Sequence, residues 1–322
     1  MIKKILCSLG TLFIFFLIYC LFALDASMYP ICPPIDPSIN QSAYDSKPQT
    51  VLVSYAAGHP IFLKNQNALV QSAAGRGFDT IHAYKRGHIS PIFYQANKDV
   101  LDQPRGAGFW LWKSYFLYEA MKNYPNGTII AYADSGIVFK APITNLLSEL
   151  KKYPIILTGE SQSTPLRKHI KMETRKILNL KNDDTTLNDE HIWAFFLILE
   201  NTPQTREVIK QWHDLCLLKG AITDLPLNEK EQDPDFSYFR HDEAILSIVA
   251  SRHKDIIKII PKPLMNTQYG VINFHRHPEK EFHSPLLRAA GIPGFISDIL
   301  FNNYLMRSMR KQFTWCTNFL SS

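Results

Sequence analysis

The chain has 322 residues, of which 46% are hydrophobic and 20% charged, so it can bury a substantial core. This composition excludes a disordered or collagen-like chain. The net charge is +6, but the basic residues are spread along the sequence and form no dense Lys/Arg block. We therefore expect no nucleic-acid partner.

The N-terminal segment predicts a membrane anchor. Residues 5–24, "ILCSLGTLFIFFLIYCLFAL", carry no charge and follow Lys3 and Lys4. A helix of this length spans about 30 Å, the thickness of one hydrocarbon core. The positive-inside rule then keeps residues 1–4 cytoplasmic and places the rest in a lumenal or extracytoplasmic compartment. The alternative is a cleaved signal peptide, but its apolar region is usually shorter, so we predict a single-pass protein with an uncleaved signal-anchor.

The exported part divides into a stem and one domain. Residues 25–48 are rich in Pro, Ser and Asn and indicate a stem that holds the domain away from the membrane. Residues 49–322 are expected to form one catalytic-size domain, since no linker interrupts them. Three cysteines, Cys32, Cys216 and Cys316, lie outside the anchor, so one disulfide is possible and its pairing is open.

The domain alternates apolar β-branched runs with helix-like stretches. We expect strands at residues 50–57, 78–84, 128–135, 154–160 and 256–261, and helices at 60–74, 112–123, 143–152, 202–220 and 241–253. Residues 191–201, "HIWAFFLILEN", fit a buried strand or a buried helix. This alternation predicts a single Rossmann-like α/β domain around a mainly parallel central sheet.

One acid ends the central strand in "GTIIAYADSG", residues 127–136. In open α/β sheets, ligands bind outside the carboxyl ends of the strands, where Asp134 is expected. Its carboxylate can hold a divalent cation that neutralises a diphosphate, or accept a sugar hydroxyl. Ser135 and Gly136 leave room for a ligand, and Ser54 ends the first strand at the same edge. The alternative role for Asp134 is to cap the following turn.

The segment "RGAGFWLWKSYF", residues 105–116, combines glycines with basic side chains. Gly106 and Gly108 permit backbone conformations that other residues resist. Arg105 and Lys113 are candidates for phosphate contacts, Arg as a fork and Lys as a point charge.

The same segment is rich in aromatic residues. Trp110 and Trp112 offer flat faces to a nucleobase or a sugar. The alternative is structural, because Phe109, Trp112 and Phe116 have helical spacing and can all belong to the core.

These motifs resemble a known family. "RGAGFWLWKSYFLYEAM" followed by "GTIIAYADSG" is similar to nucleotide-sugar glycosyltransferases with the A-type fold, and "FRHDEAILSIV", residues 239–249, resembles the later His-x-Asp-Gln/Glu helix start of that family. The likeness covers roughly residues 51–260. It implies a nucleoside-diphosphate sugar bound at the carboxyl edge of the sheet.

The chain departs from the family at one ligand. Enzymes of this fold usually carry Asp-x-Asp, whose two acids share Mn²⁺ or Mg²⁺, whereas Gly136 stands at the second acidic position here. The resemblance implies that a late histidine can complete the metal site. We therefore name Asp134, His275 and His277 as candidate metal ligands.

Asp242 is the second residue of the "HDEAILSIV" segment, where a helix is expected to begin, and has two interpretations. It can be the N-cap of that helix, a general base beside the acceptor hydroxyl, or both. The leading hypothesis is a glycosyltransferase that transfers a sugar from a nucleoside diphosphate to a glycan or another hydroxyl acceptor, with Asp134 and Asp242 catalytic. The alternatives are a metal-dependent hydrolase built on His275, His277, His283 and Asp242, or a non-catalytic carbohydrate-binding relative.

Overall fold

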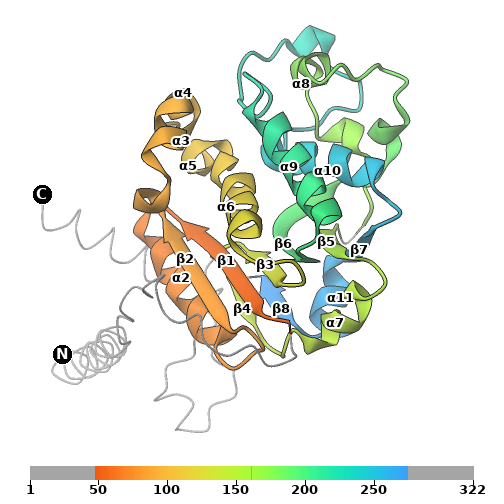
Figure 1. Ribbon diagram of the computed structural model, residues 1–322. Helices are drawn as coiled ribbons and strands as arrows, with labels where there is room; N and C mark the ends of the chain where they lie inside the picture. Colours follow the sequence, from red (N-terminus) through yellow and green to blue (C-terminus); the bar gives the residue numbers. More distant parts are fainter. Residues whose placement is uncertain (1–47, 161, 275–322) are drawn as a thin grey trace, which may run out of the picture. The chain divides into compact units, whose positions relative to one another are not determined.

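The computed structural model describes residues 48–160 and 162–274, which all belong to one compact unit. Its centre is a sheet in the order β2-β1-β3-β6-β5-β7 (Figure 1). The strands of this sheet are β1 (Thr50–Ala56), β2 (Thr80–Lys85), β3 (Ile129–Ala133), β5 (Ile155–Gly159), β6 (Ile192–Glu200) and β7 (Ile257–Pro261).

All neighbouring strands in this sheet are parallel except those that pair with β6. Strand β6 runs antiparallel to both β3 and β5. The prediction of an α/β domain with a mainly parallel sheet is thus confirmed. Because β6 is reversed, it begins at the edge where β3 and β5 end, so residues before β6 meet residues that follow those two strands.

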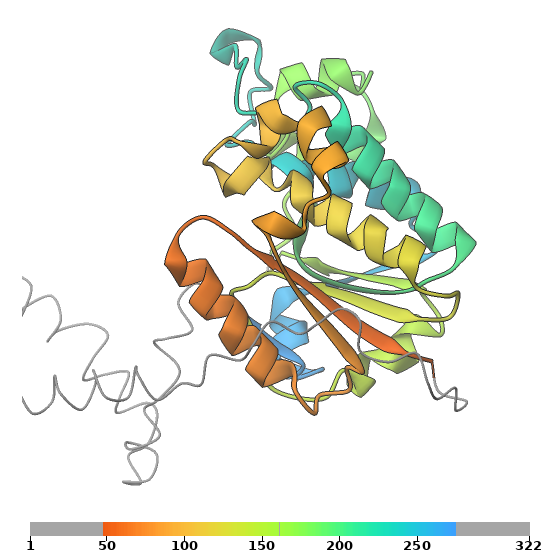
Figure 2. The same cartoon turned by 60° about the vertical axis from the view of Figure 1, so that its left-hand side comes forward.

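Helices cover both faces of the sheet (Figure 1, Figure 2). They are α2 (Pro60–Ala73), α3 (Pro91–Ala96), α4 (Lys98–Leu101), α5 (Gly106–Phe109), α6 (Leu111–Asn123), α7 (Thr144–Leu150), α8 (Met172–Ile177), α9 (Pro203–Leu217), α10 (His241–Arg252) and α11 (Lys262–Thr267). Helices α6, α9 and α10 pack on one face, and α2, α7 and α11 pack on the other.

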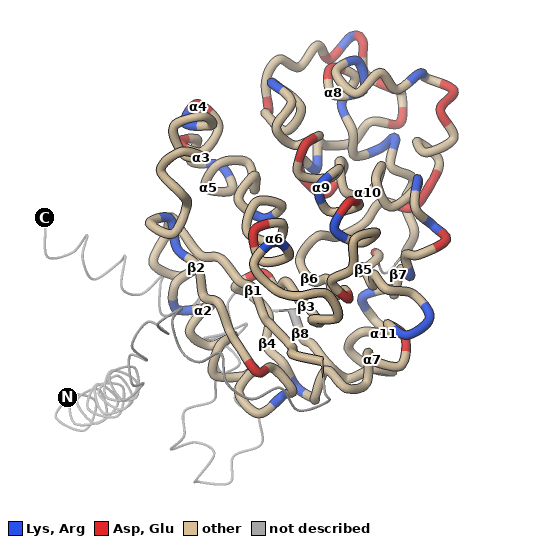
Figure 3. The backbone as a smooth tube through the Cα atoms, viewed as in Figure 1, with Lys and Arg blue, Asp and Glu red and all other residues tan. Residues whose placement is uncertain are grey.

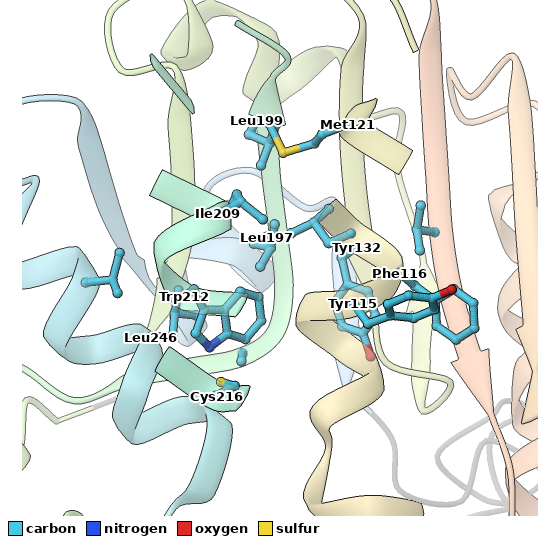
Figure 4. Close-up of a cluster of buried hydrophobic side chains, with 14 of the residues drawn as sticks. Tyr115, Phe116, Met121, Tyr132, Leu197, Leu199, Ile209, Trp212, Cys216 and Leu246 are labelled. Carbon is cyan, nitrogen blue, oxygen red and sulfur yellow. The ribbon is translucent and has the colours of Figure 1, made fainter. Parts of the chain in front are cut away.

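Alternation along the strands divides the interior into two main cores. In β1, Val51 and Val53 point to the face under α6, whereas Leu52 points to the face under α2. Figure 4 shows the first core, where Trp212 of α9 and Leu246 of α10 lie near Leu197 of β6. Both faces of the central strands are therefore buried, as the continuous apolar runs predict.

Helix α9 shows how closely local signals fix an element. The Thr202 side chain accepts from the backbone N–H of Thr205, whose hydroxyl in turn accepts from the N–H of Thr202, and Pro203 occupies the first helical position. Within residues 191–201, which the sequence leaves open between strand and helix, Ile192–Glu200 form β6.

A second, smaller sheet lies beside the central one. Strand β4 (Ile137–Phe139) pairs antiparallel with β8 (Ile272–Phe274), and Ile137 is the partner of Phe274. The backbone N–H of Lys140 donates to the carbonyl of Val271 and extends this pairing. The segment just after Asp134 is thereby held by residues far along the chain.

The anchor at residues 5–24, the stem at residues 25–48 and two of the three exported cysteines fall outside the described residues, apart from the last residue of the stem. Within residues 48–160 and 162–274, no helix combines the length and the apolar character that a membrane span requires. Cys216 is a buried free thiol. Basic and acidic residues are interspersed along the described backbone, as Figure 3 shows.

Candidate active site

Three charged side chains meet at the edge of the sheet where β1, β3 and β5 end. The Nζ of Lys113 lies 3.3 Å from Oδ1 of Asp134 and 3.4 Å from Oδ2 of Asp242. The side chains of Lys113 and Asp242 are only 2% and 3% exposed, whereas that of Asp134 is 27% exposed. Asp134 is therefore the member through which this ion-pair triad reaches solvent.

Local structure places each member of the triad. Asp134 directly follows β3, where its N–H donates to the carbonyl of Phe195 and its carbonyl accepts from the N–H of Ile137. Lys113 lies in the first turn of α6 and Asp242 in the first turn of α10. Residues from three separate elements thus converge on one point.

The prediction that Asp242 caps its helix is wrong. The N-cap of α10 is Arg240, and Asp242 is the second helical residue. Its side chain turns to Lys113 because an unpaired carboxylate would be costly in this buried position. The Asp134 side chain does not cap the following turn either. Its Oδ1 accepts from the Tyr132 hydroxyl at 2.5 Å and faces Lys113.

Burial and neighbouring charges shift the pKa values of Lys113 and Asp242. Burial alone would lower the pKa of Lys113, but the neighbouring carboxylates outweigh it and the pKa is raised. Burial raises the pKa of Asp242 to about 7, an effect that Lys113 opposes and Glu243 reinforces. Near neutral pH, Lys113 is therefore charged and Asp242 is able to exchange a proton.

The backbone before α6 is left-handed over five consecutive residues. Gly106, Ala107, Gly108, Phe109 and Trp110 have φ values of 57°, 51°, 108°, 48° and 61°. The two glycines fit this conformation without penalty, whereas each of the others adopts a region that residues with a Cβ disfavour. The special backbone geometry predicted for both glycines is confirmed, and strain of this kind gathers at functional sites.

The aromatic residues of this segment are mainly core. Phe109, Trp112 and Phe116 are all buried in the cluster under α6, which supports the structural alternative for them. Tyr55 at the end of β1 stacks on Trp112 with ring centroids 4.2 Å apart. The predicted donor-binding face of Trp112 is thus covered by a tyrosine, while Trp110 is partly buried against His241.

Arg105 lies at the rim of the site. Its side chain is 57% exposed and its Nη1 lies 3.1 Å from Oδ1 of Asp224. The same Asp224 oxygen lies 2.9 Å from Nε2 of His241. Arg105 is therefore accessible to a ligand but already held by an acid that also contacts the first residue of α10.

The small residues named from the sequence line the same edge. Ser54, at the carboxyl end of β1, is fully buried and its Oγ has no hydrogen-bond partner among the described residues. Ser135 is buried and Gly136 is half-buried in the turn between β3 and β4. No side chain at Gly136 fills the space beside Asp134.

A second polar cluster at this edge was missed from the sequence. Glu160 follows β5, and His191 precedes β6. Oε1 of Glu160 lies 3.1 Å from Nδ1 of His191, and Oε2 accepts from the Thr164 hydroxyl, which lies 3.1 Å from Nε2 of His169. The signal that could have identified Glu160 is the one used for Asp134, an acid at the end of an apolar strand.

The surroundings of this second cluster lower the pKa values of both Glu160 and His169. Burial opposes the charge of Glu160, but hydrogen bonds from His191, Thr164 and Trp193 outweigh it and lower the pKa of Glu160 to about 2. Burial, reinforced by His191, lowers the pKa of His169 to about 4. At neutral pH the cluster therefore holds an ionised carboxylate beside a neutral imidazole.

The triad offers one partial fit to a divalent cation. Both described contacts of Asp134 use Oδ1, so Oδ2 has no partner among the described residues. Mg²⁺ in proteins is commonly bound by one or two carboxylates together with substrate phosphates. The other two predicted ligands, His275 and His277, and also His283, lie outside the described residues.

Comparisons with known proteins give similarities of fold at low TM-scores. No family model and no curated protein matches the chain. Among solved structures, mouse xyloside xylosyltransferase 1 in its apo form is similar over 66% of this chain and 85% of its own, with 10% identity and a TM-score of 0.38. The galactosyltransferase LgtC in complex with donor and acceptor sugar analogues is similar over 78% of this chain and 94% of its own, with 11% identity and a TM-score of 0.40.

A third similarity is to a glycosyltransferase involved in glycosylation of the major capsid of PBCV-1. It covers 66% of this chain and 83% of the other, with 11% identity and a TM-score of 0.38. At these TM-scores the likeness carries no argument about function, and the conclusions below rest on the residues of this chain.

Proposed function

We propose that this protein is a glycosyltransferase that transfers a sugar from a nucleoside-diphosphate donor to a glycan or another hydroxyl acceptor. The observation that carries the proposal is the ion-pair triad of Asp134, Lys113 and Asp242 at the carboxyl edge of a mainly parallel sheet. Ligands of open α/β sheets bind at this edge.

The donor diphosphate is assigned to the exposed end of the triad. Two carboxylates face one ammonium, so an ionised triad carries a net negative charge and repels a bare diphosphate. A hard cation such as Mn²⁺ or Mg²⁺, held by Oδ2 of Asp134, would reverse that repulsion and neutralise charge on the leaving diphosphate. The two residues that follow Asp134, Ser135 and Gly136, have small side chains or none.

His275 and His277 remain the predicted further metal ligands. Their support is the register of the small sheet, in which Phe274 pairs with Ile137, three positions after Asp134. His275 is the next residue in the sequence.

Asp242 is assigned to the acceptor. In the transfer, the acceptor oxygen forms a bond to the anomeric carbon while the bond from that carbon to the diphosphate oxygen breaks, and the diphosphate leaves with the bonding electrons. The acceptor proton passes to Asp242, whose Oδ2 is buried and lies 3.4 Å from the Lys113 ammonium. Lys113 orients both acids and stays charged.

Arg105 completes the donor side. Its exposed guanidinium can exchange Asp224 for the diphosphate, with the left-handed turn at Gly106 and Gly108 presenting it. Ser54 and Trp112 stay predicted donor contacts, but both side chains are buried, and the Trp112 ring is stacked on Tyr55. Stabilisation of charge on the leaving group is expected to supply much of the rate.

The hydrolase alternative has less support. It requires Asp242 to bind a metal, yet the Lys113 ammonium already lies 3.4 Å from that carboxylate. Two cations on one buried carboxylate repel each other strongly. The non-catalytic alternative stays an outcome of the test below, as donor binding without turnover.

We also propose that the chain is a single-pass membrane protein with its catalytic domain in a lumenal or extracytoplasmic compartment. The support is the uncharged run at residues 5–24 after Lys3 and Lys4. Protease added to sealed vesicles should digest the domain only after the membrane is opened.

The direct test is a comparison of the full chain with Asp134→Asn. Thermal shift against a panel of nucleoside diphosphates and their sugars should show stabilisation of the wild type by one nucleotide class, stronger with Mn²⁺. Asp134→Asn should lose transfer by about 100-fold or more, with little change in melting temperature because the side chain is partly exposed. Full transfer activity in a folded Asp134→Asn protein would overturn the assignment.

A further inference from the structure

We propose that Glu160, His169 and His191 form a second metal site that binds a cation of the Zn²⁺ class and is separate from Asp134. One carboxylate oxygen and one ring nitrogen from each histidine all lie within 4.8 Å of one another. Two imidazoles and one carboxylate are a ligand set typical of Zn²⁺, with a fourth position open.

The distances suit a small tetrahedral cation. With metal–ligand bonds of about 2.0–2.1 Å, neighbouring ligand atoms in a tetrahedral site lie about 3.3 Å apart. Oε1 of Glu160 and Nδ1 of His191 are already 3.1 Å apart. The Thr164 hydroxyl lies between Nε2 of His169 and Oε2 of Glu160 and contacts both atoms. A bound cation would take the place of this hydroxyl.

The surroundings supply the partners that metal-bound histidines need. A ligating imidazole usually donates its other N–H to a carboxylate or a backbone carbonyl. Oε2 of Glu243 lies 3.8 Å from Nε2 of His191, which has no hydrogen bond among the described residues. Nδ1 of His169, on the other side of that ring from Thr164, likewise has no hydrogen-bond partner among the described residues. His191 therefore has a candidate acceptor in Glu243, and each histidine has one ring nitrogen that no described residue engages.

The two histidines of the cluster are buried, and further hydrogen bonds fix the carboxylate between them. The His191 side chain has no exposed area and His169 is 4% exposed. Trp193 Nε1 donates to Oε1 of Glu160 at 2.7 Å and fixes the carboxylate from a third side. The ligands are thus held in place before a cation arrives.

The chemistry of this site differs from that of the triad. Imidazole nitrogens favour Zn²⁺ and related transition metals, whereas Mg²⁺ and Mn²⁺ favour oxygen ligands such as Asp134. The two sites are neighbours, because Glu243 beside His191 directly follows Asp242 in α10.

The test is Co²⁺ binding to the full chain after chelator treatment. The wild type should bind Co²⁺ with the intense visible absorption of a four-coordinate ion, and Zn²⁺ should displace it. His191→Gln and Glu160→Gln should each raise the dissociation constant of Co²⁺ by at least about tenfold. The matched control is His213→Gln, which removes another buried imidazole, one that lies 3.1 Å from the Ser114 hydroxyl.

Two further variants separate this site from the other candidate ligands. Asp134→Asn and the double variant His275→Gln/His277→Gln should keep the Co²⁺ spectrum unchanged. The proposal is overturned if the wild type shows no four-coordinate spectrum, if the double variant abolishes it, or if folded His191→Gln binds as the wild type does. Far-ultraviolet circular dichroism establishes folding of each variant.

Discussion

Lys113 connects the two acids of the site, and its removal should be costly. Because it is buried between Asp134 and Asp242, Lys113→Met leaves two carboxylates without their shared cation. Loss of one partner from a buried ion pair typically costs about 3–5 kcal/mol. We expect a decrease of this size in the free energy of unfolding, measured by urea denaturation.

The matched control for this change lies on the same helix. Lys122 is 44% exposed and pairs with Glu119 one turn away. Lys122→Met should change stability by less than about 1 kcal/mol. Equal effects of the two substitutions would show that the triad does not hold the first turn of α6.

Asp242 should give the transfer rate a rising limb with pH. Burial raises its pKa to about 7, and the base needs the ionised form, so activity should increase as pH rises through about 7. The charge of Glu243 raises the pKa of Asp242 further. Glu243→Gln should therefore move the rising part of the pH–rate curve to lower pH. A pH–rate profile of the two proteins checks this, and an unchanged limb would contradict the assignment of Asp242.

The sequence predicted the acids of the site but not how they meet. Asp134 was placed correctly because the apolar run of β3 shows where that strand ends. Asp242 was placed at a helix start because the residues that begin α10 can be recognised within a few positions of sequence. Lys113 was named only as a phosphate contact, because its pairing with both acids depends on how α6 packs against β3 and α10. Glu160 and His191 were missed because their partnership depends on the antiparallel direction of β6.

At the scale of elements, the left-handed turn at α5 is the clearest point of strain. A Cβ on Gly108 would lie 2.8 Å from the Cα of Leu101, in addition to the cost of its φ of 108°. Gly108→Ala should therefore destabilise by about 2–4 kcal/mol, from the backbone and the overlap together. Gly75→Ala is the control, since Gly75 has a φ of 70° with open space around it.

Gly75→Ala should cost about 1 kcal/mol, the backbone part alone. Urea denaturation of both variants measures the difference. If the two costs are equal, the turn has room to relax, and its close packing against Leu101 does not determine the position of Arg105.

Most elements could be predicted because their signals are local. The β-branched run of β1, the cap at Thr202 and the Pro60 start of α2 each act within a few residues. Strand direction could not be predicted in the same way, since β6 is buried on both faces and its period does not separate strand from helix. Pairing with β3 and β5 determines both that this segment is a strand and that it runs antiparallel.

At the scale of the whole molecule, buried histidines should make the fold sensitive to acid. Burial lowers the pKa of His213 and of His241 to about 4. The unfolded chain binds these protons near pH 6.5, so stability is complete above that value and is lost as pH falls towards 4. Melting temperature should decline between these limits.

His213→Gln should make that decline shallower, because one fewer buried imidazole has to be charged on unfolding. The control is His88→Gln, at an exposed position. Melting curves of the three proteins from pH 7 to pH 4 measure the slopes. Parallel slopes would contradict a buried neutral His213.

The pairing of β4 with β8 also has a consequence for the order of events during synthesis. Asp134 and β4 leave the ribosome early, but their strand partner at residues 272–274 emerges only after nearly all of the described chain. Contacts between such distant segments form late, because a long loop must close first. A nascent or shortened chain thus exposes β4 as an open strand edge, where association with other chains begins. The segment after Asp134 is therefore completed only when the fold is complete, so a chain that ends before Ile272 is expected to aggregate before it can bind a donor.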